Sequence, residues 1–300
     1  MALDPASQFV NDLVVGGRGD QPAPHDHLAL RDAWGAMFSA LPPVELQCET
    51  TSIDVAGRPA ILLTPPTPTS SLLVWLHGGG WVIGSPELSL GETDLLASLS
   101  PIKVLSVDYR LAPEHPFPAA FDDSINAVQW ALDHAAELGV DPTRISVGGD
   151  SAGGNLAAAV AQHFGAQLRG QLLVYPAVDA SRVSPAALEH AEGYLLNSPT
   201  MSWFADQYIA GADRSDVRLS PLLASDEVIA TVAPAHVVIA EYDPLRDDGH
   251  DYAGKLREAG VPVSVDYHPD QMHGFFSLPS VLPGAITAIE RSAAFLAQLN

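Results

Sequence analysis

The sequence predicts an α/β fold built on a mostly parallel, eight-stranded sheet with helices on both faces. Apolar runs of strand length alternate with segments of helical periodicity from residue 45 onward, and this alternation is typical of parallel sheets. Apolar residues make up 47% of the chain, which is enough for a large core. The predicted strands cover residues 46–55, 59–64, 71–76, 102–107, 144–148, 171–175, 235–241 and 261–267.

The connections between these strands follow from local composition. The first two strands are expected to be antiparallel at one edge of the sheet, as in a hairpin. The prolines within residues 65–71 cannot sustain a ladder and predict a surface turn before the third strand. After the fourth strand, Phe121, Ile125, Val128 and Leu132 recur at helical spacing. They predict a helix that lays one apolar face on the sheet.

The segment Gly149-Asp150-Ser151-Ala152-Gly153 carries the strongest chemical signal. It follows the predicted strand 144–148 and precedes an alanine-rich helical stretch. Flanking glycines allow backbone angles that a Cβ would forbid, so the serine hydroxyl is exposed at a sharp strand-to-helix turn. This pattern is typical of a nucleophile elbow, and it makes Ser151 the candidate nucleophile.

A glycine-rich loop follows the buried strand that ends at Leu76. In His77-Gly78-Gly79-Gly80-Trp81, consecutive glycines leave bare backbone N–H groups beside the expected elbow. We predict that the amides of Gly79, Gly80 and Ala152 bind the oxygen of a tetrahedral intermediate. The alternative is a glycine-rich turn that only joins two structural elements.

A serine hydroxyl is a weak nucleophile near neutral pH, so it needs a histidine base and a carboxylate that orients this base. The predicted strand 235–241 leads directly to Asp243, which therefore lies at the carboxyl end of a strand. We expect Asp243 to be the acid. The other acids near it are Glu241, Asp247, Asp248 and Asp270. Of these, Asp247 and Asp248 are better explained as first-turn residues of a helix.

The base is chosen among eleven histidines. The loop after the last predicted strand holds His268 and His273. We select His273, because it lies far enough out on the loop to reach across the strand ends, whereas His268 is close enough to the strand to be a packed residue. His77 is expected to brace the glycine loop. The resulting chain order of Ser151, Asp243 and His273 is the order of α/β hydrolases.

Several spaced motifs together resemble the bacterial hormone-sensitive-lipase-like (family IV) esterases, from about residue 70 to the end. The motifs are His77-Gly78-Gly79-Gly80, Asp108-Tyr109-Arg110-Leu111-Ala112-Pro113-Glu114, Phe117-Pro118-Ala119-Ala120, Gly149-Asp150-Ser151-Ala152-Gly153, Asp243-Pro244-Leu245 and His273-Gly274-Phe275. The resemblance implies an α/β-hydrolase fold, hydrolysis of carboxylic esters without a cofactor, and a helical cap over the site. Glu241 departs from the pattern, because a small residue is expected there.

We therefore expect a serine hydrolase that cleaves esters of short to medium acyl chains through an acyl-enzyme. Lactone or amide hydrolysis would use the same residues, and a ligand-binding receptor without catalysis is an alternative on the same fold. Arg110 and Glu114 are expected to pair in a turn that supports the glycine loop.

The expected cap comes from two segments outside the strand–helix alternation. The chain is divided into residues 1–44 (first part of the cap), 45–177 (first part of the core), 178–230 (second part of the cap) and 231–300 (second part of the core). Aromatic residues near the site are candidates for binding the substrate, although ordinary packing is the common role of such residues. These candidates are Trp81, Tyr194, Trp203 and Phe204.

Charge and composition limit the partners. The formal charge of −22 disfavours nucleic acid and anionic membranes, so a small uncharged ester is the natural substrate. Cys48 is the only cysteine, which excludes an intrachain disulfide and multi-cysteine metal sites. His25-Asp26-His27 could offer metal ligands, but adjacent positions do not point the same way, and we expect no metal.

No apolar run is long enough to span a bilayer. No secretory signal is visible at the start of the sequence, so a cytoplasmic location is expected. A homodimer is possible.

Overall fold

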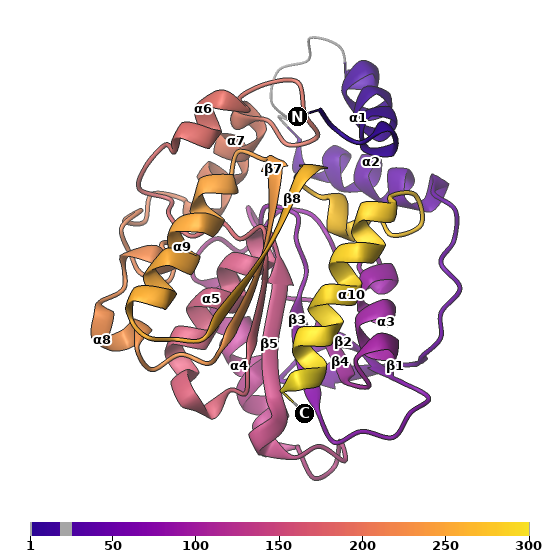
Figure 1. Ribbon diagram of the computed structural model, residues 1–300, viewed down its shortest axis with the longest axis vertical. Coiled ribbons are helices and arrows are strands. Elements are labelled where there is room, and N and C mark those ends of the chain that lie inside the picture. The colour runs from indigo at the N-terminus through magenta and orange to yellow at the C-terminus, as the bar shows by residue number, and fades with distance from the viewer. Residues whose placement is uncertain (1, 19–25, 300) are drawn as a thin grey trace.

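The computed structural model describes residues 2–18 and 26–299, and an eight-stranded sheet runs through its centre (Figure 1). All eight predicted strands are present, with ends shifted by a few residues. The strands are β1 (Glu49–Val55), β2 (Arg58–Thr64), β3 (Leu72–Leu76), β4 (Lys103–Val107), β5 (Ile145–Asp150), β6 (Gln171–Val174), β7 (Ala235–Tyr242) and β8 (Val263–Met272).

The strand order is β1-β2-β4-β3-β5-β6-β7-β8. β1 pairs with β2, and β2 with β4, in antiparallel fashion, and the remaining neighbours are parallel. The mostly parallel sheet and its antiparallel edge are therefore confirmed. Because parallel strands end at the same side of a sheet, the loops after β3, β5, β7 and β8 meet there.

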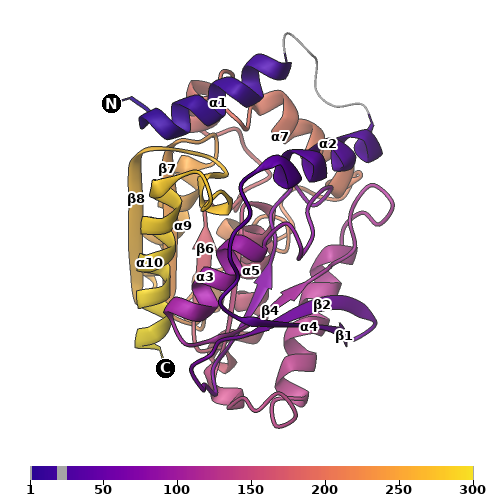
Figure 2. The same ribbon diagram turned by 90° about the vertical axis from the view of Figure 1, so that its right-hand side faces the viewer.

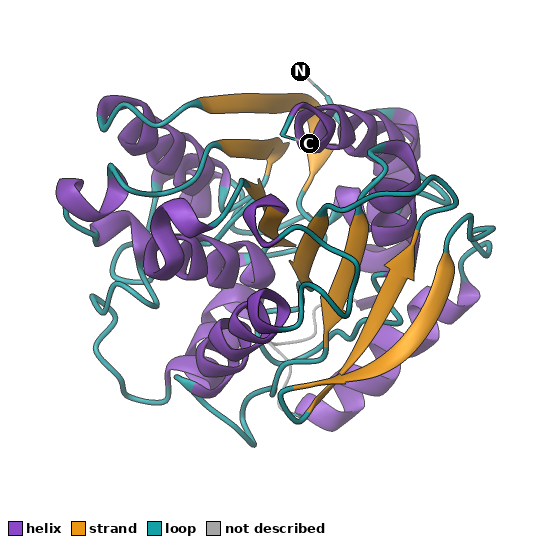
Figure 3. Ribbon diagram, turned by 90° about the horizontal axis from the view of Figure 1, so that it is seen from below, coloured by secondary structure: helices purple, strands orange, loops and turns teal. Residues whose placement is uncertain are grey.

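Helices cover both faces of the sheet, as the views in Figures 1 and 3 show. α3 (Leu90–Leu99) and α10 (Pro283–Gln298) pack side by side on one face. α4 (Ala119–Asp133), α5 (Ala152–Phe164) and α9 (Arg246–Glu258) cover the other. All five residues of β3 are fully buried, as expected for a central parallel strand with helices on both sides.

A second group of helices lies over the carboxyl ends of the strands. In Figure 2, α1 (Pro5–Arg18), α2 (His27–Ala40) and α7 (Ser198–Ile209) cross the top of the molecule. The short α6 (Pro185–Glu189) joins them in Figure 1, whereas α8 (Asp226–Ile229) lies low on the flank beside α9. The expected second cap segment is thus divided in space, because its last residues pack against the core. No helix in the described ranges combines the length and apolarity needed to cross a bilayer.

Two residues of the His25-Asp26-His27 segment have structural roles at the start of α2. Asp26 is the N-cap and accepts hydrogen bonds from the amides of Leu28 and Ala29, at 2.9 and 3.2 Å. His27 points at Glu114, 3.2 Å away, and His25 lies outside the described residues. Asp26 therefore has a structural role that needs no metal.

Arg110 and Glu114 do not pair with each other, which corrects the expectation from sequence. Arg110 binds Asp123 of α4 with its guanidinium, at 2.7 Å. Glu114 binds Arg31 of α2, also at 2.7 Å. The two side chains are neighbours in the sequence, but each faces a different helix. The pair of Arg31 and Glu114 ties α2 to the core.

The described ranges also contain four short 3₁₀ helices. They are η1 (Pro142–Arg144), η2 (Gly165–Gln167), η3 (Pro221–Leu223) and η4 (Phe275–Ser277).

Candidate active site

Ser151 lies at the sharp turn between β5 and α5. Its φ of 55° and ψ of −113° are unusual for a residue with a side chain. The turn is held by a hydrogen bond from the Ser151 amide to the Val174 carbonyl, at 2.8 Å. A Cβ on Gly153 would lie 1.8 Å from the Leu76 carbonyl oxygen, so only glycine permits this close approach of α5 to the end of β3.

Ser151, His273 and Asp243 form a continuous hydrogen-bonded chain. The His273 Nε2 atom is 2.9 Å from the Ser151 hydroxyl oxygen, and its Nδ1 atom is 2.8 Å from the Asp243 Oδ2 atom. Asp243 is fully buried, and its Oδ1 atom accepts a hydrogen bond from the Leu245 amide at 2.7 Å. A carboxylate can only accept, so Nδ1 carries the proton and Nε2 is free to accept the serine proton. The structure thus brings together the three residues chosen from the sequence.

The neighbouring acids have other partners. Asp247 accepts a hydrogen bond from the Ala186 amide at 2.8 Å, and Asp248 accepts one from the Val178 amide at 2.9 Å. Burial raises the pKa of Asp248 to about 7. Both residues lie in the first turn of α9, as their sequence position indicated. Asp247 thus holds α6, and Asp248 holds the segment before it, against the start of α9.

The two other histidines near the site are also engaged elsewhere. His268 contacts Asp266 at 2.8 Å, within β8. His77 donates from Nδ1 to the Gly78 carbonyl at 2.8 Å and stacks on Tyr109 with ring centroids 4.3 Å apart. Burial lowers the pKa of His77 to about 4, so its ring is neutral near pH 7. It packs beneath the glycine loop, where a bracing role was expected.

The glycine loop has a conformation that a side chain would strain. Gly79 and Gly80 have φ angles of 112° and 58°. The Val82 and Ile83 amides donate to the Gly79 carbonyl, at 3.1 and 2.9 Å, and fix the loop. Among the described residues, none accepts a hydrogen bond from the amides of Gly79, Gly80 or Ala152. These three donors are therefore free to bind an oxyanion.

The loops open onto a cavity of about 1140 Å³. Its walls come from the glycine loop, the nucleophile turn and the helices α1, α2 and α7. The residues of α2 that line it include Leu30, Trp34, Met37 and Phe38. The residues at and before α7 include Leu195, Leu196, Met201 and Phe204.

The four aromatic residues chosen from the sequence divide into two groups. Trp81 and Phe204 line the cavity, and Trp81 also stacks on Tyr208 with ring centroids 4.7 Å apart. Tyr194 and Trp203 do not line it. The Tyr194 ring packs against Tyr242, 5.3 Å away, and Trp203 precedes Phe204 on α7. Consecutive residues of a helix point about 100° apart, so one of the pair faces the cavity and the other does not.

Several cavity residues had no signal in the sequence. They are Ile83, Leu88, Ser89, Glu92, Ala177, Ser277 and Leu278. Glu92 lies in the first turn of α3, where an acidic residue is ordinary in the sequence of any helix. Its place in the cavity wall depends on how α3 packs, which local sequence does not determine.

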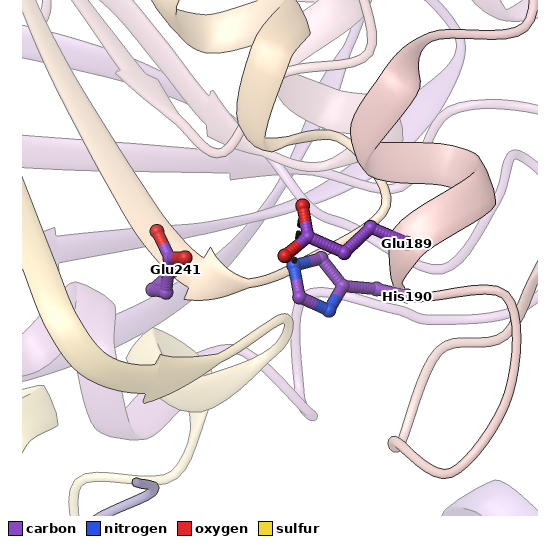
Figure 4. Close-up of side chains that lie close together, drawn as sticks. All are labelled: Glu189, His190 and Glu241. Atoms are coloured by element: carbon purple, nitrogen blue, oxygen red, sulfur yellow. Dashed lines mark ion pairs between the residues drawn. The ribbon is translucent and has the colours of Figure 1, made fainter. Parts of the chain in front are cut away.

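Glu189, His190 and Glu241 form the one cluster in the described ranges that could hold a metal ion (Figure 4). Arg246 already occupies its centre. The guanidinium lies 3.0 Å from Glu241, 2.9 Å from Glu189 and 3.2 Å from the His190 Nε2 atom. A cation in this position satisfies the acids, so these residues do not fit a metal site. The same contacts explain Glu241, because it is one of three carboxylates that bind Arg246 at the start of α9, with Glu189 of α6 and Asp247 of α9.

The fold and the site define the class of this protein. A family model described as the alpha/beta hydrolase fold matches residues 73–277, which is more than half of the chain. The hyperthermophilic esterase from Pyrobaculum calidifontis has a TM-score of 0.90 and 32% identity, and the match covers 100% of this chain and 99% of that one. An ester hydrolase from the Lake Arreo metagenome has a TM-score of 0.90 and 38% identity, with 99% and 98% coverage.

Relatives by sequence narrow the class. Carboxylesterase NlhH of Mycobacterium tuberculosis is 39% identical over 265 residues, which cover 85% of this chain and 83% of that protein. Ethyl acetate hydrolase of Pseudomonas putida is 41% identical over 245 residues, with 78% and 76% coverage. The chain belongs to the α/β-hydrolase family and is a carboxylic ester hydrolase of its hormone-sensitive-lipase-like branch.

Proposed function

We propose that the protein hydrolyses carboxylic esters of short to medium acyl chains through an acyl-enzyme on Ser151. The observation that carries the proposal is the hydrogen-bonded chain from Ser151 through His273 to Asp243, with distances of 2.9 and 2.8 Å. The hydrogen-bonded triad lies at a cavity whose wall includes the free backbone amides of Gly79, Gly80 and Ala152.

In the first half of the reaction, His273 Nε2 accepts the Ser151 proton while the hydroxyl oxygen attacks the ester carbonyl carbon. Asp243 keeps the imidazole in the required tautomer and stabilises its charged form. The amides of Gly79, Gly80 and Ala152 bind the oxyanion, aided by the N-terminus of α5. The imidazolium then protonates the leaving alcohol, and the acyl group stays on Ser151.

In the second half, a water molecule takes the place of the alcohol. His273 removes its proton, the water oxygen attacks the acyl carbon, and Ser151 leaves with the proton that His273 returns. The products are a carboxylic acid and the free enzyme. Every step uses residues of this chain alone.

The preference for short to medium acyl chains rests on the size of the cavity. A volume of about 1140 Å³, bounded by α2 and α7, must hold both the acyl and the alcohol parts of the substrate. Rates across p-nitrophenyl esters of increasing acyl length test this. We expect a maximum at short or medium chains, and efficient cleavage of long-chain triglyceride emulsions would contradict the proposal.

The same proposal assigns the cap to residues 1–44 and 178–230. Its support is that α2 and α7 supply apolar residues to the cavity wall. Trp81 and Phe204 are proposed to contact the substrate. The cytoplasmic location and a homodimer stay predictions.

Ser151→Ala tests the function directly. We expect turnover of p-nitrophenyl butyrate to fall by several orders of magnitude without loss of folding, because the triad acts as a unit. A matched control is Ser292→Ala, which removes a buried hydroxyl of α10 that has no partner among the described residues. A Ser151→Ala protein that keeps more than about a tenth of the wild-type rate would overturn the assignment.

Labelling with a phosphonofluoridate tests the receptor alternative. Covalent modification at Ser151 would indicate an active nucleophile, and an inert protein would favour ligand binding without catalysis.

A further inference from the structure

Glu92 is a buried carboxyl group that the triad does not use. Its residue is 1% exposed, and its Oε2 atom has no hydrogen-bond partner among the described residues. Burying a polar group without a partner costs free energy, so such groups are rare and call for an explanation. Glu92 also belongs to the wall of the cavity that holds Ser151.

Glu92 shares the cavity wall with other polar side chains. Ser89 precedes it by one helical turn and hydrogen-bonds to its carboxyl group, and Ser277 of η4, which packs against α3, belongs to the same cavity wall. The Ser277 hydroxyl donates to Asp150 at 3.4 Å, and Asp150 accepts the Gly78 amide at 2.6 Å. Leu88 and Leu278 are apolar members of the same cavity wall.

The charge of Glu92 follows from this environment. Burial raises its pKa well above the ordinary value, and the nearby carboxylate of Asp150 raises it further. A raised pKa favours the neutral acid, which can donate one hydrogen bond and accept others. Among the residues of the cavity wall, His77 Nε2 and Trp81 Nε1 are also buried without a described partner, but only Glu92 offers a donor and an acceptor in one group.

We propose that Glu92 recognises a hydroxyl group, or another neutral hydrogen-bonding group, on one of the two arms of the ester substrate, which are its acyl part and its alcohol part. The Oε2 atom of Glu92, which has no partner among the described residues, is the partner for such a group. An alkyl arm of the same length would leave this atom unpaired, and a site built for a hydrogen bond disfavours a substrate that lacks it. A carboxylate arm is disfavoured by Asp150. This inference rests on the proposed esterase function and names a substrate class for it.

Two substrate pairs of matched shape distinguish the arm that reaches Glu92. For the alcohol arm, 2-hydroxyethyl butyrate is compared with propyl butyrate. For the acyl arm, ethyl 6-hydroxyhexanoate is compared with ethyl heptanoate. The quantity measured is the ratio of kcat/KM values within each pair. Wild-type enzyme should favour the hydroxylated ester in at least one pair, and preference for the alkyl ester in both pairs would overturn the inference.

Glu92→Leu and Glu92→Gln then test the residue. Leucine removes the hydrogen-bonding group, and glutamine keeps a neutral one of the same shape. In the pair that wild type discriminates, we expect the ratio to fall about tenfold in Glu92→Leu and to be largely kept in Glu92→Gln. A ratio within about twofold of wild type in Glu92→Leu would overturn the inference, as would an equal loss in both variants.

Failure of the esterase function would give a different result. In that case wild-type protein would cleave no member of either pair, and Ser151→Ala would make no difference. If only the inference fails, all four esters are cleaved by a Ser151-dependent reaction, but Glu92 does not change their ratios.

Discussion

Two histidine–aspartate pairs lie in the last part of the sheet, one within β8 and one at the residues that follow β7 and β8. His268 lies 2.8 Å from Asp266, and His273 lies 2.8 Å from Asp243. All four residues are buried. The pairs differ in their third partner. His273 reaches the Ser151 hydroxyl, whereas the guanidinium of Arg291 completes the first pair at Asp266, 2.6 Å away.

This comparison separates a structural pair from one that can do chemistry. His268 lies within the paired part of β8, where it is opposite Ala240 of β7. His273 comes directly after the strand, at the edge of the sheet where the nucleophile turn also lies. A buried histidine next to an aspartate is thus not by itself a sign of catalysis. His273 differs from His268 because it follows the carboxyl end of the strand, where the Ser151 hydroxyl is within reach.

The largest expected difference between the two pairs appears when each histidine is replaced by alanine. His273→Ala should lower kcat/KM for p-nitrophenyl butyrate by about 10⁴-fold, because Ser151 loses its base. His268→Ala should change it by less than about threefold, since that ring touches no reacting group. A dead His268→Ala protein beside an active His273→Ala protein would reverse the comparison.

A smaller effect is expected when each aspartate becomes asparagine. Asp243→Asn should reduce kcat/KM by about 10³-fold, because an amide no longer favours the tautomer with Nδ1 protonated. Asp266→Asn is the matched control and should keep near-wild-type activity. Equal losses in the two variants would show that the Asp266 pair also supports catalysis.

Stability should respond to pH through the Asp266 pair. Burial acts to raise the pKa of Asp266, but hydrogen bonds from His268 and Arg291 outweigh it and hold the pKa below its ordinary value. A lowered folded-state pKa stabilises the protein above the unfolded pKa, and this stability is lost as pH falls through the folded pKa. Urea unfolding should therefore show a larger gap between wild type and Asp266→Asn at about pH 7 than at about pH 3. A gap that widens on acidification would contradict the sign.

The smallest effect is expected for Arg291. Its side chain is 58% exposed, so solvent screens the contact with Asp266. Arg291→Met should cost about 1 kcal/mol of the free energy of unfolding, measured by urea titration. Activity should not change. A loss of activity would show that the His268–Asp266 pair affects the active site, and it would weaken the distinction between this pair and the His273–Asp243 pair.

The strands and the candidate catalytic residues could be predicted because short stretches of sequence are enough to mark them. Short apolar runs mark the eight strands, and parallel strands bring their following loops to one edge. Ser151, Asp243 and His273 each follow a predicted strand, so the topology alone places them together. The glycine loop after β3 joins them for the same reason.

Side-chain partners could not be predicted, because they depend on how distant elements pack. Arg110 binds Asp123 of α4, and Glu241 binds Arg246 between two helices. Trp203 and Phe204 are adjacent and equally aromatic, yet only the second lines the cavity. Glu92 has no distinguishing sequence context at all. In each case the rotation and position of a helix decide the role.

The contact between Gly153 and the Leu76 carbonyl has a consequence for redesign. Backbone touches backbone there, so the start of α5 and the end of the strand that leads into the glycine loop are held together without side chains of α1, α2 or α7. Loops and helices above this contact can be exchanged to admit new esters while the attacking atom and the amides that receive the charge keep their spacing. The residues that select the substrate can therefore be changed separately from the residues that carry out the reaction.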